Sequence, residues 1–353
     1  METLAFSAQA EAVLARIDAE LATLDEDGVD RSAEQAEMAF ANAVHIAEAN
    51  LRHFMPGHDA RTARELVREV LFHQRMSALD QNDFDLLGLT SIDSHCGDLP
   101  WSKGTPRIFC TYHLGSYKFL FHVLSAQGVD CLLFVSGRTL AAQGQDFLES
   151  AARARVERGW TGTLTIIDAE APNSVLHGLR ALRRGTPLVL YADGNAGAGQ
   201  GEEHLRHVSF FGRTLAVRSG IAYLSHAAAA PIVPATCLRR ADGRLDLVFH
   251  EAITPGVSSV QGRSAYIDAS MQQIHDQLAA VLRPAPAQWE GWLHVHRALV
   301  NTSFDGVACA PLDADEAVRR LQDRDRYAML RYPGLHLLLD KDAFTCTVMQ
   351  RGR

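Results

Sequence analysis

The order of apolar and polar residues divides the chain into three stretches of different character. In residues 1 to about 90 the apolar residues recur at the spacing of amphipathic helices. The first such run is formed by Leu14, Ile17, Leu21 and Leu24. We expect a second helix over residues 32–54, with Ser32 as a candidate N-cap, and a third over about 59–79.

From about residue 105 short apolar runs alternate with longer amphipathic ones. The short runs predict strands at residues 107–112, 131–135, 163–168, 187–192, 231–236 and 244–250. The longer ones predict helices at residues 115–126, 140–158, 172–184, 215–228 and 261–282. This alternation indicates an α/β fold with a mostly parallel central sheet, helices on both faces and an N-terminal helical layer.

Residues 301–353 form the third stretch. The acidic run at 313–316 predicts a short helix that ends near residue 325. Short strands are expected at residues 327–332, 335–339 and 344–349, where Pro333-Gly334 and Asp340-Lys341-Asp342 separate them. We therefore predict one α/β domain over residues 1–300, including the helices of residues 1–90, and a small α+β C-terminal extension over residues 301–353.

Composition and charge narrow the classes of function. The 353 residues carry a net charge of −8, which argues against a general nucleic-acid-binding surface. The six cysteines include no CxxC pair, so no zinc site is expected, and this usage fits a reducing compartment. No apolar run reaches the ~18 residues of a membrane span, and the N-terminus lacks the pattern of a secretory signal. We expect a cytoplasmic protein without a stable membrane anchor, a metal or another cofactor.

Two candidate site residues follow predicted strands directly. His113 stands at the C-terminal end of the strand at 107–112, the usual edge for chemistry in an open α/β sheet. Imidazole moves a proton readily near neutral pH, so His113 is a candidate base. Arg138 follows the strand at 131–135, where a guanidinium can hold a phosphate or carboxylate through two hydrogen bonds. An ordinary solvated arginine is the alternative.

Two loops complete the candidate set. Asp193 opens a glycine-rich loop after the strand at 187–192 and is either a turn carboxylate or a site residue. This loop has neither the Gly-Lys-Ser/Thr of a P-loop nor the spacing of a dinucleotide fingerprint. Residues 208–214 form the second loop. Its residue types by themselves predict only a loop that is anchored by a buried aromatic side chain. Thr214 is a candidate N-cap for the helix expected at 215–228.

The order and spacing of these segments resemble the lysophospholipid acyltransferase superfamily, most closely its bacterial lipid A (lauroyl/myristoyl) acyltransferase branch. The matching stretches are His113-Leu114-Gly115, Arg138, Asp193, Phe210-Phe211-Gly212, Ala230-Pro231-Ile232-Val233-Pro234 and Gln288–Arg297. The helical segment Ala49–Pro56 is similar to the family's segment upstream of the histidine. The resemblance covers roughly residues 35–300 and implies metal-independent acyl transfer from a thioester.

The resemblance also implies roles for individual residues. His113 would be the general base, and Arg138 would bind a phosphate or carboxylate or stabilise the developing oxyanion. Asp193 would shape the site. The substrate-binding residues would be Gly115, Ser116, Asn195, Phe211, Gly212 and Thr214.

Two features depart from the family pattern. Family members carry an apolar N-terminal membrane helix, which is not seen in this sequence, and the carboxylate expected five positions after the histidine is replaced by Lys118. In the family that carboxylate orients the ring and stabilises the imidazolium, whereas an ammonium has the opposite effect. Either Lys118 belongs to an altered catalytic group in which neutral His113 serves an amine acceptor, or it points away and Asp193 orients His113.

These observations favour a soluble acyltransferase in specialised (natural product) biosynthesis. It would move an acyl group from a carrier-protein or coenzyme A thioester to a small amine or hydroxyl acceptor. An acyl or peptidyl carrier protein would be the partner, and its acidic surface would suit two arginine clusters that are otherwise solvated helix faces. The clusters are Arg153, Arg155, Arg158 and Arg180, Arg183, Arg184.

Two alternatives remain: a peripheral acyltransferase that acts on lipid A or another lipid, and a non-catalytic binding protein of the same fold.

His294 and His296 are expected on one face of a closing strand, a spacing that could suggest metal ligation. No third ligand is apparent, which favours a structural role for both.

Overall fold

The computed structural model describes residues 2–25, 35–96, 101, 104–194, 201, 204–256, 260–300 and 312–349. Contacts between residues divide the chain into two compact units. The first unit comprises residues 1–10, 73–210 and 215–289, and the second comprises residues 11–72, 211–214 and 290–353. The helices α1 (Glu2–Asp25) and α3 (Ala60–Asp80) contribute residues to both units.

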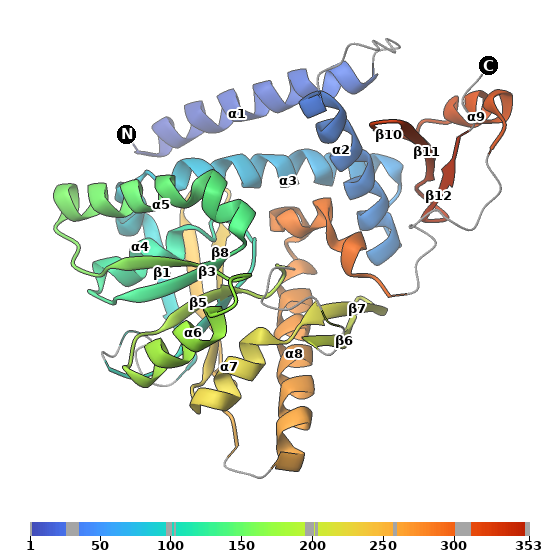
Figure 1. Cartoon of the computed structure of the whole chain (residues 1–353). Helices are drawn as coiled ribbons and strands as arrows, with labels where there is room; N and C mark the ends of the chain where they lie inside the picture. Colours follow the sequence, from blue (N-terminus) through green and yellow to red (C-terminus); the bar gives the residue numbers. More distant parts are fainter. Residues whose placement is uncertain are drawn as a thin grey trace. The chain divides into compact units, whose positions relative to one another are not determined.

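The first unit is built on a seven-stranded sheet with the order β1-β9-β8-β2-β5-β3-β4 (Figure 1). The strands are β1 (Thr90–Ser94), β2 (Ile108–Thr111), β3 (Cys131–Val135), β4 (Leu164–Asp168), β5 (Leu188–Tyr191), β8 (Ile232–Arg239) and β9 (Leu245–Phe249). The strands from β8 to β4 are parallel, whereas β9 runs antiparallel to β8 and parallel to β1. The predicted α/β fold with a mostly parallel sheet is confirmed.

Helices cover both faces of this sheet. The helices α4 (Phe119–Ala126) and α5 (Gly137–Arg158) lie over the face that carries Leu133 and Val189. On the opposite face, α6 (Ser174–Arg183) packs against Phe134 and Leu188, and α7 (Gly220–Ala228) contacts α6 and α8 (Val260–Leu282). Because both faces are covered, β2 and β3 consist of buried residues throughout, as is typical of parallel strands.

The second unit contains the predicted C-terminal elements. The helix α9 (Ala314–Leu321) precedes a three-stranded antiparallel sheet of β10 (Tyr327–Tyr332), β11 (Leu335–Asp340) and β12 (Thr345–Val348). The helix α2 (Gln35–Phe54) packs on this sheet through a small apolar core, and the buried Lys341 ammonium pairs with the carboxylate of Glu48. The boundary expected at residue 300 stays a prediction.

Several predicted elements are corrected by the structure. The helix expected at 215–228 begins only at Gly220, because residues 213–218 form the strand β7 (Arg213–Arg218), which pairs with β6 (Leu205–Phe210). The two strands are joined by Phe211 and Gly212, whose φ angles of 48° and 74° suit a two-residue hairpin turn. Thr214 therefore lies in a strand and does not cap a helix.

The remaining corrections concern the ends of the elements. The helix expected from residue 115 begins at Phe119, and the candidate N-cap Ser32 lies outside the described residues. The closing strand expected around His294 and His296 is wrong, because the segments Glu290–Leu293 and Val295–Ala298 are 3₁₀ helices. His294 and His296 therefore do not lie on one face of a strand.

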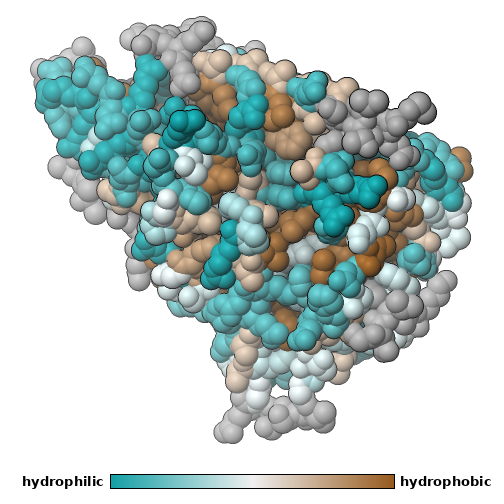
Figure 2. Space-filling model, turned by 180° about the vertical axis from the view of Figure 1, so that it is seen from behind, coloured by the Kyte–Doolittle hydropathy of each residue, from teal (hydrophilic) through white to brown (hydrophobic). Residues whose placement is uncertain are grey.

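Large apolar side chains on the described surface are spread over several elements. They are Leu79, Leu148, Val156, Leu176, Val318, Tyr332 and Leu335. On the face drawn in Figure 2, brown apolar areas lie among teal hydrophilic ones. No helix in the described ranges combines the length and the apolar character that crossing a bilayer demands.

Candidate active site

The ends of β2 and β5 bring His113 and Asp193 together. The two strands are parallel neighbours, and Thr111 of β2 is in register with Tyr191 of β5. His113 and Asp193 each follow that registered pair by two residues, and the N–H of Ala192 donates to the carbonyl of Thr111 at 2.8 Å. His113 and Asp193 must therefore emerge side by side at the C-terminal edge of the sheet.

Asp193 holds His113 at two points. One carboxylate oxygen lies 2.9 Å from Nδ1 of His113, and the other accepts the backbone N–H of His113 at 2.9 Å. The second oxygen also accepts the indole N–H of Trp289 at 2.7 Å. Both the position and the rotation of the imidazole are therefore fixed by one carboxylate.

The Asp193 carboxylate is buried, with 4% of its side chain exposed, yet it is ionised. Burial by itself would raise its pKa. Attraction to His113 and the hydrogen bonds from His113 and Trp289 outweigh burial and hold the pKa of Asp193 at about 2. The carboxylate is then an acceptor only, so Nδ1 of His113 carries the hydrogen of their shared bond.

This arrangement assigns the two ring nitrogens of His113. With Nδ1–H directed at Asp193, Nε2 is the basic nitrogen of the neutral ring, the atom that can accept a proton. The side chain of His113 is 27% exposed, so an approaching substrate can reach it. A buried acid that orients a partly exposed imidazole is an arrangement that can support proton transfer.

Two tyrosines contact the ring of His113. Tyr191, the last residue of β5, stacks on its face with ring centroids 4.6 Å apart and an interplanar angle of 20°. Tyr117 meets it edge-on at 4.9 Å and 71°. The imidazole is therefore held by a carboxylate at one edge and by aromatic rings around it.

The turn after His113 is anchored by close backbone contacts. Gly115 has a φ of +58°, and its N–H donates to the carbonyl of Gln288 at 2.7 Å. A Cβ at this position would lie 2.2 Å from the carbonyl oxygen of Cys237 in β8, so only glycine fits. The N–H of Ser116 donates to that same carbonyl at 2.9 Å.

A buried ion pair supports this turn from beneath. The hydroxyl of Ser116 donates to Asp80, and Asp80 pairs with the guanidinium of Arg239 at the end of β8. Burial raises the pKa of Asp80, and the charge of Arg239 counteracts that rise. Gly115 and Ser116, expected to bind substrate, are both placed where they hold the backbone of the His113 turn.

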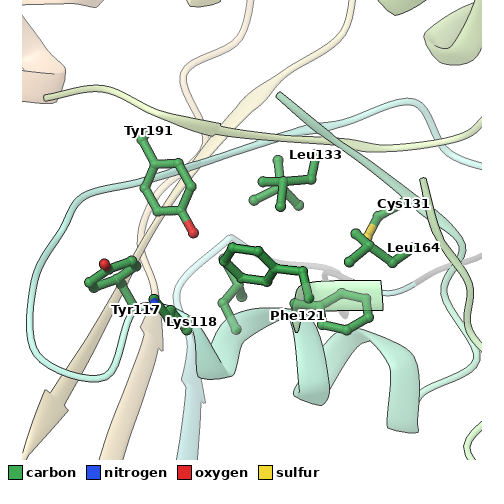
Figure 3. A pocket seen from close by; sticks show the side chains of 10 residues that line it. Tyr117, Lys118, Phe121, Cys131, Leu133, Leu164 and Tyr191 are labelled. Atoms are coloured by element: carbon green, nitrogen blue, oxygen red, sulfur yellow. The ribbon is translucent and has the colours of Figure 1, made fainter. Parts of the chain in front are cut away.

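An apolar pocket lies beside the two tyrosines. Its lining comprises Tyr117, Lys118, Leu120, Phe121, Cys131, Leu133, Phe147, Leu164, Val189 and Tyr191. Figure 3 shows Tyr117, Lys118 and Tyr191 at one end, Cys131 and Leu164 at the other, and Phe121 between them. With the side chains in these positions, the pocket has room for about one water molecule.

Lys118 lies at the polar end of this pocket, immediately before α4. Its ammonium is 3.3 Å from the amide oxygen of Gln143 and 5.5 Å from the ring centre of Phe147. The carboxylate that contacts Nδ1 of His113 is Asp193, as in the second of the two alternatives for this position, and a catalytic role for Lys118 stays a prediction.

The other expected site residues are less closely gathered. Arg138 lies in the first turn of α5, after the C-terminal end of β3, and its side chain is exposed. Asn195 lies outside the described residues. Phe211, Gly212 and Thr214 belong to the second unit, where the ring of Phe211 lies 6.2 Å from that of Trp292. Their role in binding substrate stays a prediction.

The two arginine clusters lie at the opposite edge of the sheet from His113. The helix α5 ends at Arg158 just before β4 begins, and α6 ends at Arg183 just before β5 begins. Since β4, β5 and β2 are parallel, these helix ends flank the N-terminal ends of the strands. Arg158 also pairs with Asp85, and Arg153 donates to the carbonyl of Asn82 at 3.3 Å.

Three residues of the site were not singled out from the sequence: Trp289, Tyr191 and Tyr117. Trp289 is 96 positions from Asp193 along the chain, so no local pattern links them. Tyr191 reads locally as one more apolar residue of a buried strand. For the two tyrosines the available signal was position, because Tyr191 ends the strand before Asp193 and Tyr117 lies four residues after His113. For Trp289 it was the matching stretch at residues 288–297.

Comparison with known proteins agrees with the resemblance read from the motifs. Residues 170–297 match the family "bacterial lipid A biosynthesis acyltransferase", a stretch that includes Asp193 and Trp289. No curated protein matches the sequence. Among solved structures, the chain is similar to the 1-acyl-sn-glycerophosphate (LPA) acyltransferase PlsC from Thermotoga maritima. That likeness has 13% identity and a TM-score of 0.32, and covers 69% of this chain and 93% of that one.

Proposed function

Because residues 170–297 match the bacterial lipid A biosynthesis acyltransferases, we propose that this chain transfers an acyl group from a thioester to an amine or hydroxyl acceptor, with His113 as the base. One observation carries the proposal: the buried, ionised Asp193 holds Nδ1 of a partly exposed histidine at 2.9 Å. With Nδ1–H directed at Asp193, Nε2 is the ring nitrogen that would take the proton.

The proposed reaction needs one proton carrier. Nε2 of His113 takes the proton of the acceptor N–H or O–H as the acceptor atom attacks the carbonyl carbon of the thioester. The tetrahedral intermediate then collapses, the carbon–sulfur bond breaks, and the leaving sulfur takes the proton back from the imidazolium. Throughout, Asp193 stabilises the positive ring, which is the role that the resemblance assigns to the carboxylate replaced by Lys118.

With this carboxylate in place, the base does not depend on an easily activated acceptor. A His–Asp pair serves a hydroxyl as well as an amine, so the replacement at Lys118 does not by itself restrict the acceptor to amines. Lys118 and Arg138 both follow strands at the C-terminal edge of the sheet, where their charges would attract the phosphate of a carrier-bound or coenzyme A thioester. A carrier protein would accordingly dock at this edge, and not at the arginine clusters of the opposite edge.

The apolar pocket supplies a place for the acyl chain. Its polar end is formed by the tyrosines that contact His113, and its interior is lined by Leu133, Leu164 and Phe121. A thioester carbonyl next to Nε2 would then direct the chain beneath α4. Since the pocket has room for about one water molecule, an acyl chain could enter it only if the lining side chains move apart.

A second acceptor class is favoured by one observation, the family match itself, whose description names lipid A biosynthesis. A glycolipid acceptor and a small soluble acceptor would use the same base and the same donor. They differ in what the purified enzyme acylates, so one experiment can separate them.

The test incubates the purified chain with acyl-carrier and acyl-coenzyme A thioesters of several chain lengths and reads the products by intact mass. Amines, alcohols and a glucosamine-based glycolipid are offered in parallel. We expect transfer to one class, and a loss of at least about 100-fold in His113→Ala, as is usual for a general base. The control is His177→Ala, which changes an exposed histidine on α6.

Two results would count against this function. In one, the wild-type protein leaves every thioester intact under all acceptor conditions. In the other, the folded His113→Ala variant transfers as fast as the wild type, which would make the His113–Asp193 pair structural.

A further inference from the structure

The rings of His113, Tyr117 and Tyr191 form a compact group at the polar end of the pocket. Tyr191 lies flat against His113, Tyr117 meets the same imidazole edge-on, and the two tyrosines stand at 88° to each other with centroids 5.5 Å apart. Tyr117 and Tyr191 also line this end of the pocket in Figure 3, together with Lys118. The imidazole therefore has a defined aromatic face as well as a defined acidic edge.

The strand β5 supplies both. Tyr191 is its last residue, and Asp193 follows two positions later. Tyr191 is in register with Thr111, which lies two positions before His113. The end of β5 therefore places a ring against the face of the imidazole and a carboxylate against its Nδ1. The two contacts are thus geometrically coupled.

The face of an aromatic ring carries negative potential, which attracts a cation held against it. A neutral imidazole gains only dispersion from the stack, whereas an imidazolium gains this attraction too. In a partly exposed site the difference corresponds to about two- to five-fold in the protonation equilibrium of the ring. Tyr191 thus favours the charged form that exists only while the proton is on His113.

We propose that Tyr191 is a positioning residue for the transfer reaction: its ring, and not its hydroxyl, holds His113 in plane and stabilises the imidazolium during acyl transfer. This inference rests on the proposed function of His113 as the base. The ring of Tyr191 would stabilise the imidazolium from its face, in addition to Asp193, which contacts the edge of the same ring. The ring also forms part of the pocket wall, so its effect on the base must be separated from its effect on the acyl chain.

The test compares Tyr191→Phe, Tyr191→Trp and Tyr191→Leu with the wild type. One readout is the titration of the His113 ring, followed by NMR of the imidazole carbons in the folded protein without substrate. We expect Phe to preserve the midpoint and Leu to move it about half a pH unit lower, which equals a roughly three-fold loss in proton affinity. Trp, which has the strongest face, should raise it or leave it unchanged.

The second readout is the pH dependence of kcat with the donor that the wild type uses. For a base, the rate rises as the ring loses its proton, so Leu should move this rise to lower pH and reduce the plateau about two- to five-fold. The control is Leu164→Ala, which alters the far end of the pocket, away from the ring stack, and should leave the His113 midpoint unchanged.

The outcomes are distinguishable. An unchanged His113 midpoint in the folded Leu variant overturns the inference, as does an equal shift in the Phe variant, which would assign the effect to the hydroxyl. Absence of transfer in the wild type would refute the proposed function, while the NMR titration would still report whether Tyr191 stabilises the charged ring.

Discussion

The buried carboxylate of Asp193 offers a sharp test of the site because it can be probed without knowing the substrate. Asp193→Asn removes the charge and keeps the size and an oxygen that can accept a hydrogen bond. The variant therefore changes the electrostatics between Asp193, His113 and Trp289 with little change of shape. Any pH dependence that disappears with the charge belongs to this carboxylate.

The contribution of this charge to the free energy of unfolding follows from the pKa of Asp193. The pKa of about 2 in the folded protein lies below the ordinary 3.8, and this difference corresponds to about 2 kcal/mol of stability. Since the folded pKa is depressed, this contribution is fully present above the unfolded value near 4 and is lost as the pH falls toward 2. Between pH 5 and pH 3 the loss amounts to about 1 kcal/mol.

Urea unfolding at pH 5, 4 and 3 measures this contribution, followed by far-UV circular dichroism and by the combined fluorescence of the four tryptophans, Trp289 among them. We expect the free energy of unfolding of the wild type to exceed that of Asp193→Asn, and the excess to shrink by about 1 kcal/mol from pH 5 to pH 3. The control is Asp146→Asn, on the exposed face of α5, for which no such narrowing is expected.

A constant difference between wild type and Asp193→Asn over this pH range would refute the reasoning. It would mean that the carboxylate titrates normally and that attraction to His113 does not keep it ionised in the folded protein. A narrowing of the same size in the Asp146 control would refute it as well.

Two further predictions concern the support of the His113 turn. Gly115→Ala should destabilise the protein by about 3 kcal/mol, because its Cβ meets the carbonyl of Cys237 at 2.2 Å and φ is +58°. Gly212→Ala, with φ +74° and open space around it, should cost only about 1 kcal/mol; equal falls in melting temperature would contradict the packing argument. Arg239→Met should cost about 3–5 kcal/mol at pH 7 by leaving Asp80 buried without its cation. That loss should decrease toward pH 4 as the carboxyl takes up a proton, and a pH-independent loss in urea unfolding would argue for simple loss of packing.

Much of the architecture was accessible from local patterns. Apolar periodicity is a property of consecutive residues, so the strands β2, β3 and β5 and the helices α5, α6 and α8 were placed to within a few residues. The position of His113 at a strand end followed from the same patterns. The errors lie where local preference is ambiguous. The sequence predicts the start of a helix within residues 213–218, whereas these residues form a strand of the hairpin with β6.

The site itself depends on long-range order. The position of β5 between β2 and β3 is decided by how all the strands pack, and only this order brings Asp193 to His113. The indole of Trp289 arrives from 96 residues away, and the arginine clusters prove to lie at the other edge of the sheet because of strand direction. Hydrophobic spacing along the chain fixes which residues are buried, whereas the partners of a buried polar group depend on contacts that the spacing does not encode.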